Sequence, residues 1–290
     1  MPTARKTAQN AASGHTREDL VRAMEAGAAG YVGDLGDWWA LRAADALHAR
    51  EFRRIVRWLV KQLPQSPARI LDYACGTGHL MHHLRRVFPT AHLIGYDGAE
   101  PLLTIGRASF ADDKRAELRQ KWLPDLADPC PPVDLSIVCF PHLLMSDDRS
   151  GLRAYRQAHR AEATAARRLW EEMIDAEHWD PEEDDRAFRV GQTLFERMCA
   201  RHCHRVTRPG GYCLRVGYAY SGLEEIDPVY LAYSRFSEGW DHLCCGVVVD
   251  ELFRLVASRY VESAVIDDVH AQTGDEEEGG GYTLCLLQRI

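Results

Sequence analysis

The chain has 290 residues, of which 46% are hydrophobic, and a formal net charge of −8 at pH 7. This length and apolar content support one large globular domain, or one domain with sizeable insertions. The negative charge argues against a nucleic-acid backbone as the main partner, because phosphate binding requires a basic face. No apolar run approaches the roughly 20 residues that cross a bilayer, and the first residues lack the apolar core of a signal peptide. Nine cysteines without a CxxC pair indicate free thiols in a reducing compartment. We therefore expect a soluble cytoplasmic protein with no membrane partner.

The N-terminal quarter of the chain divides into a tail and a helical region. Residues 1–15 are small and polar, which predicts a disordered tail. Residues 16–67 are expected to form a helical lid, with a long helix over residues 37–63 where apolar side chains recur near helical spacing. Pro64 then ends this helix.

Residues 70–80, which read ILDYACGTGHL, are the most informative part of the chain. An apolar run that ends in an acid predicts a buried parallel strand, and the small residues after it predict a tight turn that opens a helix. Gly76 and Gly78 permit backbone angles that side chains forbid, and they let a ligand approach the main chain. The helix points its free N–H groups at the turn. This arrangement suits the ribose, carboxylate or phosphate end of a nucleotide-like cofactor.

A second strand over residues 91–97 is expected after a helix that ends by Pro89. It ends at Asp97, about 20 residues beyond the glycine turn, a spacing at which a carboxylate can accept hydrogen bonds from both ribose hydroxyls of a nucleoside.

The remaining strands are predicted from apolar runs and turn residues. A third strand around residues 118–126 leads to Asp125 and Leu126, and a fourth covers residues 133–140. The turn Pro209-Gly210-Gly211 precedes the fifth strand. The chain is then expected to form a helix over residues 247–258 and two last strands, over residues 261–266 and 282–287.

The pattern Asp72-x-Ala74-x-Gly76-x-Gly78 resembles the first motif of the class I S-adenosylmethionine-dependent methyltransferases, with Ala74 in place of the first glycine. The resemblance covers roughly residues 68–140 and 203–290. It implies an α/β, Rossmann-like fold: a seven-stranded, mostly parallel sheet with an antiparallel last strand. A helical cap from the N-terminus and from an insertion between strands four and five would cover it, so residues 68–290 would form the S-adenosylmethionine-binding domain.

The resemblance also implies roles for single residues. Asp97 would hold the ribose of S-adenosylmethionine, and Asp125 would meet the adenine amino group, with Asp128 as a rival. The implied cofactor site consists of Asp72, Ala74, Cys75, Gly76, Gly78, Asp97, Gly98, Asp125, Leu126 and Cys139.

A nicotinamide dinucleotide site is the weaker alternative. That fingerprint requires three glycines at GxGxxG spacing, and Met81 stands at the third position.

The insertion over residues 146–204 and the region after the fourth strand are expected to face the substrate. His142, directly after that strand, is the candidate general base or substrate ligand, and a structural histidine capping the next helix is the alternative. The acidic segment 171–185 would attract a cationic amine or basic peptide, or it is a solvated face.

A metal site is not expected. The cluster Cys199, His202, Cys203 and His204 lacks the second ligand pair that zinc sites need.

The sequence thus predicts S-adenosylmethionine-dependent O- or N-methylation of a small molecule, with secondary metabolism as one setting. A peptide or protein substrate, a different reaction of the same cofactor, and a scaffold role without turnover remain as alternatives. The sequence leaves a homodimer open.

Overall fold

The computed structural model describes residues 40–41, 44–121, 130–140, 160–161, 163–165, 167–168, 171, 194, 197–220, 252–263 and 280–290. The elements in chain order are α3 (Ala46–Gln62), β1 (Arg69–Tyr73), α4 (His79–Val87), β2 (His92–Asp97), α5 (Glu100–Ser109), β3 (Ala116–Gln120), β4 (Val133–Cys139), β5 (Thr207–Tyr220), β6 (Phe253–Glu262) and β7 (Gly280–Arg289). Residues 197–206 are helical and lead directly into β5. The expected tail over 1–15, the lid before residue 40 and most of the insertion over 146–204 lie outside the described residues.

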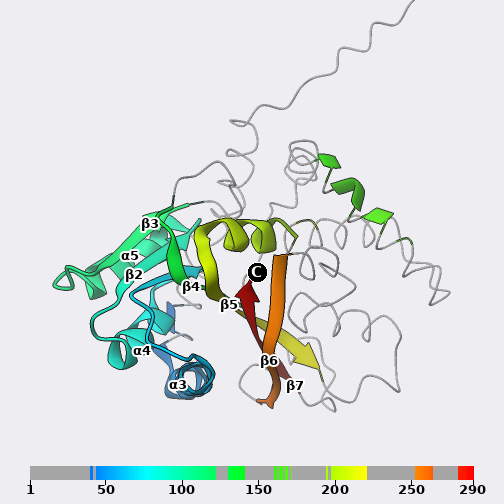
Figure 1. The fold of residues 1–290 in the computed structure, drawn as a ribbon. Helices are drawn as coiled ribbons and strands as arrows, with labels where there is room; N and C mark the ends of the chain where they lie inside the picture. Colours follow the sequence, from blue (N-terminus) through cyan, green and yellow to red (C-terminus); the bar gives the residue numbers. More distant parts are fainter. Residues whose placement is uncertain are drawn as a thin grey trace, which may run out of the picture.

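The strands form one seven-stranded sheet in the order β3-β2-β1-β4-β5-β7-β6 (Figure 1). The strands from β3 to β5 in that order run parallel to their neighbours, whereas β7 is antiparallel to both β5 and β6. The predicted α/β, Rossmann-like sheet with an antiparallel last strand is therefore confirmed. In such a sheet the carboxyl ends of the parallel strands meet at one edge, where ligands bind.

Helices cover both faces of the central strands. On one face, α3 and α4 pack on buried strand residues such as Ile70, Ile137 and Leu286. On the other face, the helical residues 197–206 lie against the sheet: the rings of Tyr73 and His202 meet edge to face, with centroids 5.2 Å apart. Burial on both faces explains why β1 and β4 read as continuous apolar runs.

Helix α3 begins later than the predicted start at residue 37, although residues 40 and 41 are also helical. The carboxylate of Asp45 caps it by accepting the Leu47 N–H at 3.0 Å. Its end at Gln62 matches the predicted end before Pro64. Among the described residues, none of the helices is both long and apolar enough to cross a membrane.

Two predicted elements need correction. The third strand begins earlier than predicted and ends at Gln120, which pairs with Asp97, while residues 122–126 of the predicted range lie outside the described residues. The helix predicted over residues 247–258 is wrong from residue 253 onward, where the chain forms β6.

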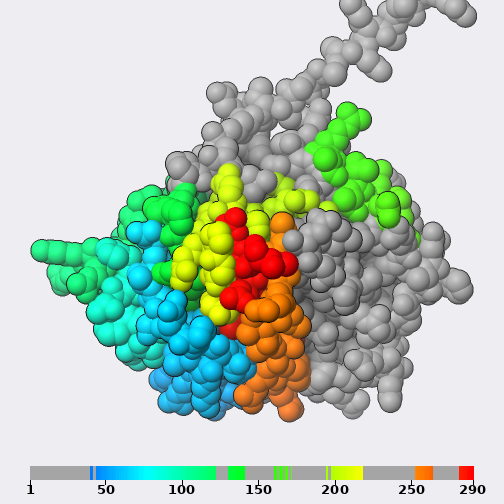
Figure 2. All heavy atoms as spheres, viewed as in Figure 1, coloured from blue at the N-terminus to red at the C-terminus, as the bar shows by residue number. Residues whose placement is uncertain are grey.

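The error over β6 has a physical cause. The helical spacing of apolar residues there does not mark a buried face, because Leu255 is 57% exposed and Val256 is 41% exposed. β6 lies at the end of the strand order and is visible at the molecular surface in Figure 2. Instead, pairing with β7 and the burial of Phe253 and Val261 determine its strand conformation.

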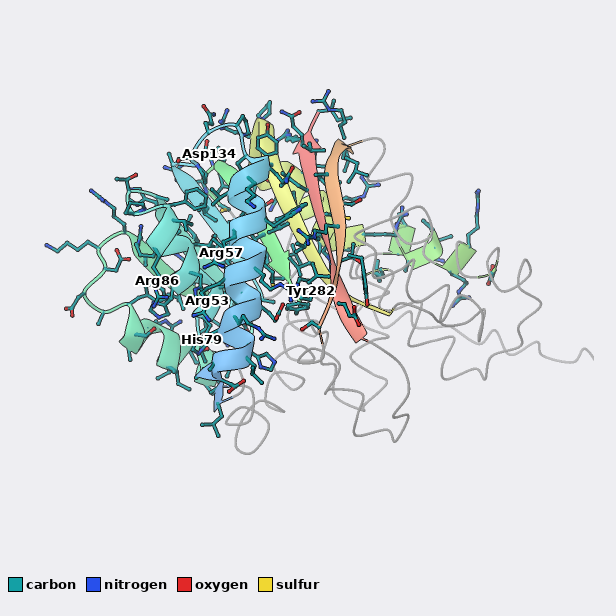
Figure 3. The ribbon with its side chains drawn as sticks, turned by 90° about the horizontal axis from the view of Figure 1, so that it is seen from below. Arg53, Arg57, His79, Arg86, Asp134 and Tyr282 are labelled. Carbon is teal, nitrogen blue, oxygen red and sulfur yellow. The ribbon has the colours of Figure 1, made fainter. Side chains whose placement is uncertain are left out.

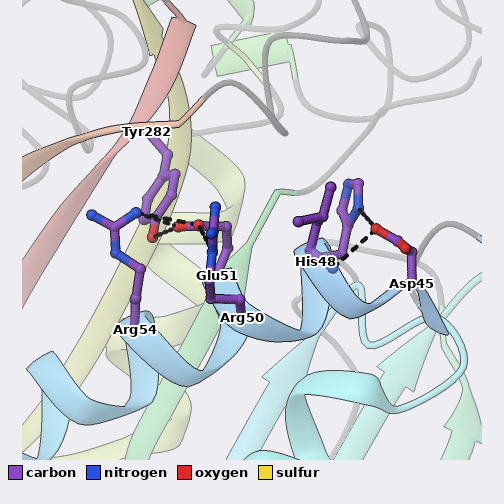
Figure 4. Close-up of polar contacts among 7 residues, drawn as sticks. Asp45, His48, Arg50, Glu51, Arg54 and Tyr282 are labelled. Carbon is purple, nitrogen blue, oxygen red and sulfur yellow. Dashed lines mark hydrogen bonds and ion pairs between the residues drawn. The ribbon is translucent and has the colours of Figure 1, made fainter.

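A buried polar contact fixes α3 to β7 (Figure 4). The Tyr282 hydroxyl donates to a carboxylate oxygen of Glu51 at 2.8 Å, and Arg50 and Arg54 donate to the same carboxylate. Glu51 is only 2% exposed, so these donors replace its water. Burial and the bond to Glu51 raise the pKa of Tyr282 above its usual value, so the phenol stays protonated.

Replacing Tyr282 by phenylalanine is expected to lower the free energy of unfolding by about 1–3 kcal/mol, because it removes only the hydroxyl and leaves a buried carboxylate short of a donor. Urea denaturation measures this loss. Tyr212→Phe is the matched control, since among the described residues the Tyr212 hydroxyl has one long contact, which it accepts from the Gln288 side chain at 3.4 Å. Equal stability of the two variants would contradict the assignment.

Candidate cofactor site

The glycine turn between β1 and α4 has an unusual backbone. Ala74, Gly76 and Gly78 have φ values of 54°, 52° and 80°. Gly78 has a second constraint, because a Cβ there would lie 2.8 Å from Cε2 of Phe110. The turn is tied to the neighbouring strand, as the Cys75 N–H donates to the Tyr96 carbonyl at 3.1 Å. The sequence prediction of a tight glycine turn after β1 agrees with this geometry.

Strain at this edge is not confined to the turn. Among the described residues, Ala74 and Phe140 are the non-glycine residues with positive φ, and they follow β1 and β4 directly. Such backbone outliers cluster at functional sites, where the surrounding structure holds them.

Replacing Ala74 by glycine is expected to stabilise the protein by about 0.5–1 kcal/mol. The left-handed region costs an L-residue about 1–2 kcal/mol, which exceeds the entropy that a glycine loses on folding. Chemical denaturation checks the gain. Ala49→Gly is the control: Ala49 lies within helix α3, where glycine costs about 1 kcal/mol relative to alanine, so the same change should lower stability there. A loss of stability in both variants would show that Ala74 is not strained.

Asp97, at the end of β2, reaches into the glycine turn. Its Oδ2 accepts the Gly76 N–H at 2.8 Å, and its Oδ1 accepts the Ala99 N–H at 2.8 Å. Burial raises the pKa of this carboxyl, and the backbone donors only partly offset that effect. Each carboxylate oxygen can accept more than one hydrogen bond, so capacity for a ligand remains. The ribose role of Asp97 stays a prediction.

Asp72, on β1, is a buried carboxyl without a complete set of partners. It is 2% exposed, and its Oδ2 accepts no hydrogen bond from any residue that the structure describes. Burial, and secondarily the charge of Asp97, raise its pKa well above the usual value. Because unpaired buried carboxyls are costly, Asp72 is a candidate contact for a ligand.

Two thiols lie at the same edge. Cys75 is in the turn and Cys139 ends β4, and both are buried. Burial raises the pKa of each thiol well above its usual value. Neutral thiols are poor nucleophiles, so these side chains contribute packing to the site.

The structure brings together the predicted residues from β1, the turn, β2 and β4, while Asp125, Leu126 and His142 lie outside the described residues. Gly98 is placed beside β3, where its carbonyl accepts the Gln120 side-chain N–H at 3.0 Å. Sequence reasoning missed Gln120, because the third strand was placed too late. It also missed Phe140, whose ring meets Tyr282 with centroids 5.7 Å apart.

The cysteine–histidine cluster after residue 198 packs into the fold. His202 contacts the ring of Tyr73, and His204 contacts the ring of Phe253. Within the described ranges, three or more His, Cys, Asp or Glu side chains nowhere gather as a metal site would require.

Comparison with known proteins identifies part of the chain. Residues 70–164 match the model of a methyltransferase domain family. Magnesium protoporphyrin IX methyltransferase (ChlM) from Synechocystis PCC 6803, solved with bound SAH, is 13% identical with a TM-score of 0.51, over 94% of this chain and 100% of that one. The likeness to ChlM shows the fold alone.

Two further structures are more distant. The N-methyltransferase NodS from Bradyrhizobium japonicum WM9, in complex with S-adenosyl-L-homocysteine, is 11% identical with a TM-score of 0.48, over 95% of this chain and 98% of that one. TrmN from Thermus thermophilus is 12% identical with a TM-score of 0.46, over 83% of this chain. The chain spans 48% of TrmN and 59% of the pyocyanin biosynthetic protein PhzM.

No curated protein sequence matches the chain. The matched domain and the strand order 3-2-1-4-5-7-6 around the glycine turn nonetheless agree. Residues 70–164 thus match a methyltransferase domain, and the sheet around them has the Rossmann-like methyltransferase fold.

Proposed function

We propose that this protein binds S-adenosylmethionine and transfers its methyl group to an oxygen or nitrogen atom of a small molecule. The observation that carries the proposal is the pair of carboxyls on either side of the glycine turn, of which Asp72 is buried and Asp97 is half-buried. Both belong to the segment that matches the methyltransferase domain.

The residues fit this cofactor in three ways. The orphaned Oδ2 of Asp72 can receive a cationic or N–H group, which S-adenosylmethionine carries in its amino acid part. Asp97 can accept further bonds from ribose hydroxyls. Within the described part of the chain, a Cβ added at Gly76 would meet only Leu102, at 3.9 Å, which leaves room for a ligand to approach the turn.

The bound cofactor supplies a methyl group made electrophilic by its sulfonium. The chain's own residues bind this cofactor and orient it. Asp97 fixes one end of the ligand to the turn, because the same carboxylate is held by Gly76 and Ala99. Such positioning is the main requirement of an in-line displacement, in which the acceptor atom must face the methyl carbon. His142 as general base remains part of the proposal and lies outside the described residues.

Calorimetric titration with S-adenosylmethionine and S-adenosylhomocysteine tests the cofactor site, with NAD as the control ligand. Micromolar binding of the first two and none of NAD is expected. Binding of NAD alone would overturn the assignment, and absence of all binding would favour a scaffold role. With the cofactor established, transfer of labelled methyl groups to small-molecule extracts, compared with peptide libraries, decides between a metabolite and a peptide acceptor.

A further inference from the structure

The helices α3 and α4 concentrate positive charge, although the whole chain carries a formal charge of −8. Helix α3 contains five arginine or lysine residues and one acid. Helix α4 contains two arginines and no acid. Because the two helices pack side by side on one face of the sheet, their charges form one surface (Figure 3).

Only part of this charge is neutralised. Arg50 and Arg54 pair with Glu51, and Arg85 pairs with Asp113. Arg53, Arg57, Lys61 and Arg86 are exposed and form no ion pair with any residue that the structure describes. We call these four side chains the basic face.

The lowered pKa of a buried histidine reflects the positive charge of the basic face. His83, on α4, is 8% exposed and its pKa is lowered to about 4. Burial is the main cause, and the next two are Arg86 of its own helix and Arg53 of α3. Charges from both helices therefore act at one point without a compensating acid there among the described residues.

The basic face also has apolar neighbours. Val60 follows Arg57 by three positions on α3 and is 41% exposed, and Val87 follows His83 by four positions on α4 and is 40% exposed. Exposed apolar groups beside unpaired arginines are typical of protein interfaces. A long polyanion such as nucleic acid would also meet the net negative charge of the rest of the chain.

We propose that the basic face docks an acidic, partly apolar segment of a partner protein. The proposal does not depend on the proposed function, because none of the four residues belongs to the cofactor site. Helix α4 starts at the glycine turn, whereas Arg86 lies in its last turn.

Fluorescence anisotropy of the whole protein tests the docking, with a fluorescein-labelled peptide of three Glu-Glu-Leu-Glu repeats as the probe. Binding is expected to weaken as salt rises from about 50 to about 300 mM. The triple variant Arg53→Glu, Arg57→Glu, Arg86→Glu should bind at least tenfold more weakly. The matched control reverses three exposed cations elsewhere and should bind within twofold of the parent: Lys114→Glu, Arg167→Glu, Arg259→Glu.

Thermal unfolding and S-adenosylhomocysteine affinity of both triple variants show whether the fold is kept. An equal loss of peptide binding in the control variant would overturn the proposal, as would no binding at the lowest salt concentration. Tighter binding of a DNA duplex of about 20 base pairs, or of phosphatidylserine vesicles, would assign the surface to a polyanion or a membrane instead. A peptide with serine in place of leucine should bind more weakly. If it binds as tightly as the leucine peptide, apolar contacts do not contribute to binding, and the proposed docking of a protein segment is overturned.

Discussion

Replacing Asp97 by alanine is expected to weaken S-adenosylmethionine binding by about 100-fold or more. A hydrogen bond to a charged group contributes about 1.5–3 kcal/mol, and in the proposed site Asp97 would accept two of them from the ribose hydroxyls. Since about 1.4 kcal/mol corresponds to a factor of ten in affinity, two bonds account for this loss. The variant also frees the Gly76 and Ala99 N–H groups, which loosens the turn that receives the ligand. Calorimetry measures the affinity.

A control is needed because Asp97 also supports the fold. Asp113 makes the same kinds of contact away from the site: it accepts the Arg115 N–H at 2.9 Å and pairs with Arg85. Asp113→Ala should therefore lower the melting temperature and leave cofactor affinity unchanged. If Asp97→Ala binds S-adenosylmethionine as tightly as the wild type does, Asp97 does not hold the ribose, whatever the stability of the variant.

The parts of the site that could be predicted from the sequence are local in the chain. Gly76, Gly78 and Asp97 belong to one strand–turn–helix–strand unit, in which each position follows from spacing and residue type. The apolar runs over β1, β2 and β4 were recognisable because both faces of these strands are buried.

What could not be predicted depends on distant partners. Glu51 and Tyr282 are 231 positions apart, and neither stands in a motif. β6 was misassigned because its apolar residues have helical spacing while the chain pairs with β7 at the sheet edge. The positive φ of Ala74 is a third case, since alanine gives no signal for a left-handed backbone.

Replacing Asp72 by asparagine is expected to raise the stability of the protein and to abolish tight cofactor binding. Burial, with the charge of Asp97, places the pKa of folded Asp72 well above its unfolded value of about 3.9. Below that value both states hold the proton. As pH rises toward the folded pKa, only the unfolded state releases it, so the wild type loses stability. An asparagine at this position would not titrate, so Asp72→Asn should gain about 1–3 kcal/mol near pH 8 and nothing near pH 4.

Asp134, at the start of the neighbouring strand β4, is the matched control because the same change should have the opposite effect there. Partial burial raises its pKa, but donors from Arg69, Arg208 and Ala68 outweigh this and lower it overall. Asp134→Asn should therefore cost stability near pH 7, and the difference from wild type should shrink as pH falls through the folded pKa.

Urea denaturation between about pH 4 and pH 8 measures both variants, and calorimetry measures their affinity for S-adenosylmethionine. Asp72→Asn should gain stability and lose affinity, whereas Asp134→Asn should lose stability and keep affinity. A carboxyl whose removal improves folding is explained only by what it binds, since the described part of the folded chain gives its Oδ2 no partner. Loss of stability in Asp72→Asn near pH 8 would instead mean that the carboxylate is satisfied within the fold, and that Asp72 supports the turn without meeting the ligand.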